Sequence, residues 1–406
     1  MNVLLAPPAI PEFASLRPED VPAAIDTLLA ESRAQVAALA EQKSPTWASL
    51  ALPLEAIDDR LNSAWSPVSQ LNAVVNSEAW REAYNSCLPK LSAYGTEMGQ
   101  NESLFQAWQA LHDSSEFARL DAAQQQAVRN NLRDFRLSGI GLPAAEKQRY
   151  AEISERLSQL QSTFADHVLD ATQAWSLNLK DASRLSGIPE SGLALMSSLA
   201  EGHEGVAYRL TLDMPVYINV MTFADDRDLR EMLYTAYATR ASEQGPNAGE
   251  FDNGPLIAEI LALRHEQAQL LGYEHYAALS LAPKMADSVE QVDAFLHDLA
   301  VKARPGAERD FDELKAFAAR ECAIDALQPW DMTYVSEHLK QQRYALSQEE
   351  LKPYFPAPRV IDGLFAVAKK LFGFDVVPAP ELETYHPDVL AYAIKEQGET
   401  RAWFYL

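Results

Sequence analysis

Apolar residues recur along most of the chain with the spacing of amphipathic α-helices. The clearest stretch, 144–175, has a stripe whose members are four, three, four and four positions apart, which places them on one side of a helix. That stripe consists of Ile153, Leu157, Leu160, Phe164 and Val168. From Pro18, an early proline and two acidic residues precede a second periodic stretch, which predicts a helix to about Gln42.

The same spacing predicts nine further helices. They are Leu54–Trp65, Ser77–Glu97, Ser103–His112, Asp121–Phe135, Arg227–Arg240, Leu256–Leu271, Ser288–Ala319, Ser347–Leu351 and Arg359–Leu371. Tryptophans at 65, 80, 108, 175 and 330 lie in segments with apolar periodicity, so we interpret them as core residues; stacking platforms for nucleic acid are the alternative.

Extended segments are few and short. Alternating apolar and polar residues predict a strand at Trp175–Lys180. Two further strands are predicted at Val206–Leu212 and Val216–Met221, which flank Asp213-Met214-Pro215. A C-terminal hairpin is predicted from Val389–Lys395 and Arg401–Tyr405, which flank a turn containing Gly398. The pattern therefore indicates a mainly α protein with a small β insertion near residues 175–221.

No repeat of fixed period and no long Gly, Ser or Pro linker divides the chain. The densest cluster of helix breakers is Gln244–Gly249. We predict an N-terminal helical region over 1–174, the β insertion over 175–221 and a second helical region over 222–385.

The charge balance argues against two classes of partner. The 406 residues include 34 Lys and Arg and 58 Asp and Glu, for a net charge of −24, which repels nucleic acid and anionic membrane surfaces. The apolar run at the N-terminus stops at Pro7, too early for a secretory signal, and no stretch of about 18 apolar residues is present. Cys87 and Cys322 are too far apart in the chain to form a C-x-x-C pair. These features favour a cytoplasmic protein.

The histidines do not form the pair that an H-E-x-x-H zinc site needs, because two imidazoles four residues apart must reach one metal ion. The eight histidines, at 112, 167, 203, 265, 275, 297, 338 and 386, are never closer than ten residues. The nearest approach to the motif begins at His265-Glu266, but glutamine at 269 replaces the second histidine. We interpret this segment as a surface helix that carries a histidine.

Three His/carboxylate pairs have helical spacing and could each be half of a metal or acid–base site. They are His112 with Glu116, His167 with Asp170, and Asp293 with His297. On so acidic a chain, solvated contacts are the simpler interpretation. Four acids, Glu308, Asp310, Asp312 and Glu313, lack the glycine and terminal glutamate of a calcium loop and indicate a solvated helix face.

Other catalytic motifs are missing from the sequence. It contains no G-x-S-x-G and no phosphate-binding loop, and Gly139-Ile140-Gly141 has no third glycine to complete a dinucleotide motif. From residues alone we predict no catalytic, cofactor-binding or metal-binding residue.

A series of short segments, in order along nearly the whole chain, resembles the bacterial branch of the thimet oligopeptidase family of zinc metallopeptidases. The segments are Pro11–Phe13, Arg17–Val21, Arg133–Gly139, Leu169–Thr172, Thr239–Ser242, Asp252–Asn253, Glu259–Arg264, Leu270–Tyr273, Ala282–Ala286, Trp330–Tyr334, Pro353–Pro356 and His386–Val389. So many collinear matches make the resemblance far more specific than a single motif.

The resemblance implies a mostly helical, two-lobed peptidase with a deep channel that admits short peptides. It places zinc on an H-E-x-x-H helix with a glutamate as third protein ligand, where metal-activated water attacks the peptide carbonyl. In the family these residues follow the strand that here ends the chain, Ala402–Leu406, so none has a counterpart in this sequence. Residues 386–406 would begin the catalytic region, and the aromatic end of the chain leads us to expect a continuation that covers it.

Two hypotheses follow. The first is the N-terminal portion of a cytoplasmic zinc endopeptidase, monomeric at full length, in which this part shapes the substrate channel and restricts substrate size while zinc is bound beyond Leu406. The second is a stand-alone helical peptide-binding or scaffold protein without catalysis. Under the first, the isolated chain alone is inactive and exposes apolar surface that binds a hydrophobic dye or drives self-association.

Overall fold

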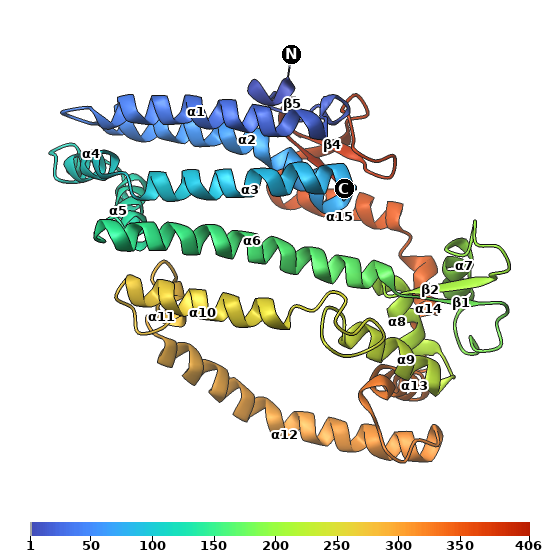
Figure 1. The fold of residues 1–406 in the computed structure, drawn as a ribbon. Coiled ribbons are helices and arrows are strands. Elements are labelled where there is room, and N and C mark those ends of the chain that lie inside the picture. The colour runs from blue at the N-terminus through green and yellow to red at the C-terminus, as the bar shows by residue number, and fades with distance from the viewer. Residues whose placement is uncertain (1) are drawn as a thin grey trace. The chain divides into compact units, whose positions relative to one another are not determined.

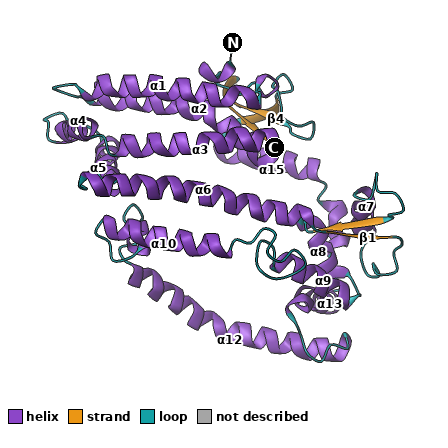
Figure 2. Cartoon of the chain, viewed as in Figure 1, coloured by secondary structure: helices purple, strands orange, loops and turns teal. Residues whose placement is uncertain are grey.

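The computed structural model describes residues 2–406 and confirms a mainly α protein (Figures 1 and 2). Its contacts divide the chain into two compact units. The first comprises Met1–Ser162, Leu261–Asp287 and Ile361–Leu406, and the second comprises Thr163–Ile260 and Ser288–Val360. The region boundaries expected from the sequence remain a prediction.

The first unit begins with five helices that follow the predicted periodicity. They are α1 (Val21–Ala40), α2 (Leu52–Val74), α3 (Glu78–Gly99), α4 (Glu102–His112) and α5 (Ala122–Leu137). Polar side chains start three of them: Ser77, Asn101 and Asp121 accept hydrogen bonds from the backbone of the first turns of α3, α4 and α5. α6 (Ala144–Ala174) begins in this unit and continues into the second.

The core of the first unit lies where these helices face one another. Ile25 and Leu28 of α1 pack in one cluster with Val68 of α2 and Trp80 of α3, while Trp108 of α4 lies in a second cluster. Of the five tryptophans predicted to be core residues, Trp80 and Trp108 are buried and the other three are partly buried. Both cysteines are free thiols.

The last segment of the first unit contains a three-stranded antiparallel sheet. It consists of β3 (Asp375–Pro378), β4 (Ala391–Glu396) and β5 (Glu399–Tyr405), in the order β3-β4-β5. The predicted hairpin is confirmed, and Gln397 and Gly398 both adopt positive φ at its turn. β3 was not predicted. Phe365 of α15 (Ala357–Phe372) packs on Tyr392 of β4 with ring centres 4.9 Å apart.

The second unit is also mostly helical, and one sequence prediction is wrong there. Val216–Met221, predicted as a strand, is part of α8 (Met214–Phe223). Pro215 stands in the first turn of α8, and Val216 and Val220, four residues apart, are both buried on one face. Tertiary burial thus decided the conformation over strand propensity.

The β insertion is smaller than predicted. β1 (Ser176–Leu179) pairs antiparallel with β2 (Tyr208–Thr211), which confirms the first two predicted strands, but a helix, α7 (Glu190–Ser198), lies between them in the sequence.

The remaining elements are mostly helical. They are α9 (Arg227–Ala238), α10 (Gly254–Leu270), α11 (Tyr276–Leu281), α12 (Val289–Glu321), α13 (Met332–Tyr344) and α14 (Gln348–Leu351), with short 3₁₀ turns at Val3–Leu5, Phe13–Ser15, Pro18–Asp20, Phe117–Arg119, Pro329–Asp331 and Lys352–Tyr354, and a π-helical turn at Trp47–Ala51. α11 and α13 were not predicted. Among the described helices, none combines the length and apolar character needed to cross a bilayer.

Candidate functional site

The histidine and glutamate of the incomplete zinc motif, His265 and Glu266, both lie on the surface of α10. His265 is exposed, and Glu266 accepts two hydrogen bonds from the Arg149 guanidinium of α6, at 2.6 and 2.8 Å. These hydrogen bonds hold the pKa of Glu266 below its usual value. The glutamate therefore anchors two helices of the first unit to each other.

The first of the three predicted His/carboxylate pairs, His112 with Glu116, is not formed on one helix. α4 ends at His112, so helical spacing does not apply to Glu116; His112 Nδ1 lies 2.9 Å from Asp113 Oδ1. Glu116 accepts a hydrogen bond from the Trp47 backbone at 3.0 Å.

The two other pairs lie on continuous helices. His167 Nδ1 lies 2.9 Å from Oδ1 of the buried Asn253, whose amide donates to the Phe164 carbonyl at 3.1 Å. Asp293 and His297 are both exposed on α12.

The acidic cluster of α12 is solvated, as its composition indicated. All four carboxylates are exposed, and three contact a basic side chain: Glu308 contacts Arg304, Asp312 contacts Lys315, and Glu313 contacts Arg343. Exposed pairs of this kind contribute little to stability.

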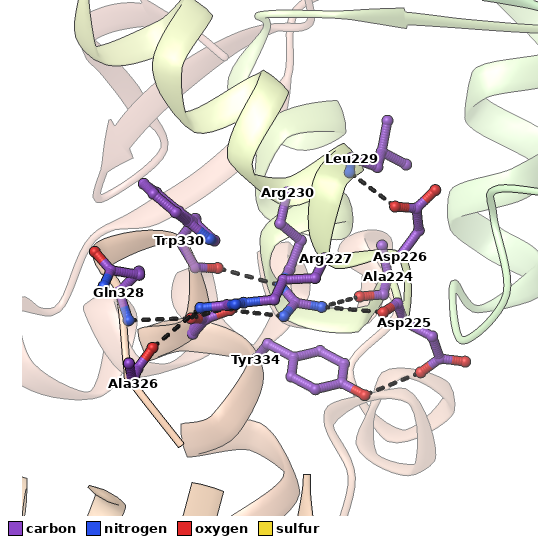
Figure 3. Close-up of polar contacts among 11 residues, drawn as sticks. Ala224, Asp225, Asp226, Arg227, Leu229, Arg230, Ala326, Gln328, Trp330 and Tyr334 are labelled. Atoms are coloured by element: carbon purple, nitrogen blue, oxygen red, sulfur yellow. Dashed lines mark hydrogen bonds and ion pairs between the residues drawn. The ribbon is translucent and has the colours of Figure 1, made fainter. Parts of the chain in front are cut away.

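The second unit contains a buried ion-pair network around Asp331 (Figure 3). Arg230 of α9 donates to Oδ1 of Asp331 at 2.9 Å, and Arg227, one turn earlier, donates to Oδ2 at 2.7 Å. The Gln328 backbone N–H supplies a further hydrogen bond to Oδ2 at 3.0 Å. The buried carboxylate is thus surrounded by donors.

The Arg230 guanidinium has several partners in addition to Asp331. Besides Asp331, it donates to the backbone carbonyls of Trp330 at 3.2 Å and Ala224 at 2.6 Å, and it lies 4.0 Å from the centre of the Tyr334 ring. A buried charge needs such partners, because an unpaired guanidinium would cost several kcal/mol. The network therefore joins the loop before α9 to the start of α13.

A second layer of contacts supports the network. Tyr334 donates its hydroxyl hydrogen to Asp225 Oδ1 at 3.0 Å, and Ser186 donates to Oδ2 of the same carboxylate at 2.6 Å. Burial, followed by the hydrogen bond to Asp225, raises the pKa of Tyr334 to about 12. The phenol therefore stays protonated at neutral pH and acts as a hydrogen-bond donor.

Local sequence explains how these groups are positioned. Asp226 caps α9 by accepting a hydrogen bond from the Leu229 backbone at 2.9 Å, and it also pairs with Arg184 at 2.6 Å. Gly187 has φ +86°, and a Cβ there would lie well inside van der Waals distance of the Phe223 carbonyl oxygen. Only glycine allows this loop to approach α8.

The network stabilises structure and is poorly suited to proton transfer. Burial favours a higher pKa for Asp331, but hydrogen bonds from Arg227, Arg230 and the Gln328 backbone outweigh it and lower the pKa. A carboxylate held ionised by two guanidinium groups is a weak base. The sequence offered one signal for this site: two arginines three positions apart at the start of a helix.

Comparison with known proteins matches most of the chain to peptidases. Residues 220–406 match the pattern of Peptidase family M3, and residues 25–147 match the Neurolysin/Thimet oligopeptidase N-terminal domain. Oligopeptidase A of Escherichia coli (strain K12) is 48% identical over 407 residues, which cover 100% of this chain and 60% of that protein. The chain is therefore similar to peptidase family M3 over residues 220–406 and to oligopeptidase A over its whole length.

Relatives with lower sequence identity are also peptidases. A probable cytosolic oligopeptidase A of Arabidopsis thaliana is 36% identical over 100% of this chain and 58% of its own length. The dipeptidyl carboxypeptidase of Escherichia coli is 26% identical over 97% of this chain and 58% of that protein. The chain thus spans about 60% of the length of the relatives that it matches. The Asp331 network lies within the segment that matches family M3.

The similarity to peptidase family M3 implies zinc in the full-length protein, but the residues of this chain do not fit that ion. Zinc sites use three or four His, Cys, Asp or Glu ligands. Within residues 2–406, no group of three or more such side chains is arranged to hold a metal ion. No catalytic step is therefore assigned to any residue described above.

Proposed function

We propose that the full-length protein is a zinc-dependent endopeptidase that hydrolyses short peptides in the cytoplasm, and that this chain forms its non-catalytic part. In this proposal the chain shapes the substrate channel and restricts substrate size, and the zinc ligands lie in sequence beyond Leu406. The observation that carries it is the match to peptidase family M3 together with 46–48% identity to bacterial oligopeptidases A.

The distribution of histidines supports a zinc site outside this chain. No two of the eight histidines are closer than ten residues, so no helix of this sequence can present the paired imidazoles of H-E-x-x-H. Glu266, the glutamate nearest to that pattern, is paired with Arg149. The spacing of the histidines and the pairing of Glu266 with Arg149 both support a catalytic site that lies outside this chain.

The test compares the 406-residue chain with the full-length protein. A quenched fluorescent peptide reports hydrolysis with and without 1,10-phenanthroline, and mass spectrometry of the metal reports zinc content. We expect chelator-sensitive turnover and bound zinc for the full-length protein only. Chelator-sensitive turnover by the 406-residue chain would refute the assignment of catalysis to the remainder.

Substrate size is tested on the full-length protein. A series of peptides of increasing length and a folded protein that contains the same cleavable sequence are compared at equal concentration. We expect cleavage of the short peptides and protection of the folded protein. Equal cleavage of both would contradict a channel that excludes folded chains.

A peptide-binding or scaffold function without catalysis is the second candidate, favoured only by the missing H-E-x-x-H. Reading the gene beyond Leu406 separates the two candidates. A stop codon there supports the scaffold, whereas an H-E-x-x-H within the following sequence excludes it.

A further inference from the structure

A cavity of about 490 Å³ lies within the first unit, among α1 to α5 and the turn Trp47–Ala51. This volume is within the range of pockets that hold small organic ligands, roughly 300–1,000 Å³. Its wall is largely apolar and aromatic, with Trp47, Trp108 and Phe135 among the lining side chains. The cavity is separate from the Asp331 network, which belongs to the second unit.

The charged side chains that line this cavity are all acidic. Three carboxylates line it, those of Glu55 and Asp58 on α2 and of Asp134 on α5, and all three residues are exposed, which places them at the rim. Its lining includes no Lys, Arg or His among the described residues. Asp134 already pairs with Arg133 at 2.8 Å.

Asp58 is the carboxylate best placed to meet a ligand. Although Asp58 is exposed as a residue, neighbouring atoms partly desolvate its carboxylate and raise its pKa, with no cationic partner contributing among the described residues. A positive charge beside Asp58 would relieve this unfavourable desolvation. The rim therefore selects for a cation.

Tyr94 provides a second polar group in the wall. Its side chain is 6% exposed, and its buried hydroxyl lies beside the polar side chain of Ser32. Burial raises the pKa of Tyr94, and the Asp58 carboxylate raises it further. The phenol therefore stays protonated at neutral pH and adds no charge to the cavity wall.

We propose that this cavity binds a small organic cation, an ammonium group attached to an aromatic or branched aliphatic body. The ammonium would lie beside Asp58, and the body would fill the space between Trp47 and Trp108. Aromatic faces add cation–π attraction to the carboxylate field. An anionic ligand would face three carboxylates, and a neutral one would leave Asp58 unpaired. This assignment is independent of the proposed peptidase activity.

The experiment measures binding of phenethylamine to the purified chain by titration calorimetry. The neutral 2-phenylethanol and the anionic 3-phenylpropionate have similar shapes and serve as comparison ligands. We expect phenethylamine to bind about tenfold more tightly than 2-phenylethanol, the size of one charge-assisted contact, and 3-phenylpropionate not to bind. Equal binding of the amine and the alcohol would overturn the proposal.

Matched variants locate the site. Asp58→Asn should lower phenethylamine affinity about tenfold, while Asp59→Asn, which removes the same charge from an exposed neighbour outside the lining, should leave it unchanged. Ala127→Leu adds bulk to the lining without changing charge and should abolish binding. Thermal melts confirm that each variant is folded. If the two Asp variants act alike, the binding is general attraction to an acidic protein and the assignment fails.

A further ligand tests whether the cavity binds peptide amino termini or free amines. L-Phenylalaninamide carries the same ring and an ammonium in the form of a peptide amino terminus. Binding as tight as that of phenethylamine supports the site as one for peptide amino termini, whereas its exclusion supports free amines. Insensitivity of both ligands to Asp58→Asn would overturn the cation site.

Discussion

Arg230 and Asp331 form a buried ion pair, with Nη2 and Oδ1 2.9 Å apart, across 101 positions of sequence. Their side chains are 1% and 0% exposed. Arg227 pairs with the second oxygen of Asp331 from the exposed side, at 2.7 Å. The start of α9 and the turn before α13 are thereby joined by a buried, charge-assisted contact.

Removing the carboxylate should destabilise the second unit strongly. Asp331→Ala leaves Arg230 buried without its counter-ion, and we expect a loss of about 3–5 kcal/mol in the free energy of unfolding. Urea unfolding followed by circular dichroism measures it. Asp325→Ala, at an exposed position nearby, is the matched control and should change stability little. A similar loss for both variants would show that the network is not responsible.

The same network predicts a dependence on acid. The folded pKa of Asp331 lies below the ordinary value of 3.8, so its stabilisation is complete above about pH 3.8 and is lost as pH falls through the folded pKa. The difference in unfolding free energy between the wild-type chain and Asp331→Asn should therefore be constant near neutral pH and shrink below pH 3.8. A difference that stays constant to lower pH would contradict the ionised assignment.

Gly187 should be far less tolerant of a side chain than a glycine of similar backbone conformation. Gly187→Ala combines positive φ with a collision against the Phe223 carbonyl oxygen, whereas Gly202→Ala at φ +82° meets nothing within 4 Å. We expect a cost of about 1–3 kcal/mol for Gly202→Ala, from backbone strain alone, and a clearly larger cost for Gly187→Ala. Paired thermal melts decide this, and equal costs would exclude a close approach.

Glu266 should be dispensable for catalysis. Because it pairs with Arg149 on the surface, Glu266→Gln in the full-length protein should leave kcat and zinc content unchanged. Peptide hydrolysis and metal analysis provide the measurement. A large fall in kcat with zinc retained would instead indicate that the segment beginning at His265 takes part in chemistry.

Apolar residues exposed on α15 should bind a hydrophobic dye. Val360, Leu364, Val367 and Leu371 recur every three or four residues and are all exposed, and this helix has no buried residue. We expect the isolated chain to enhance dye fluorescence more than the full-length protein does, since the remainder would cover this face. Leu364→Ser with Leu371→Ser should reduce the signal, and Lys370→Ser should not. A monomeric chain that binds no dye would contradict the prediction.

Much of the helical fold could be predicted from sequence because each helix carries its own periodic stripe. The stripe at Ile153, Leu157 and Leu160 predicted α6 almost to the residue, and all three side chains are buried. The hairpin of β4 and β5 was predicted because its turn signal is local. α8 was not, because Val216–Met221 has both β-branched composition and helical burial, and only the packing of Val216 and Val220 decides between them.

The candidate sites were less predictable from sequence than the helices were. The sequence by itself determined the acidic charge, the helical class and the lack of an H-E-x-x-H pair, since each of these is a matter of composition or of spacing along one helix. The partnership of Arg230 with Asp331, the approach of Gly187 to Phe223 and the acidic rim of the cavity near Asp58 were decided only by folding. Each joins groups from different elements, and local spacing carries no information about which distant residue will supply a buried charge with its partner.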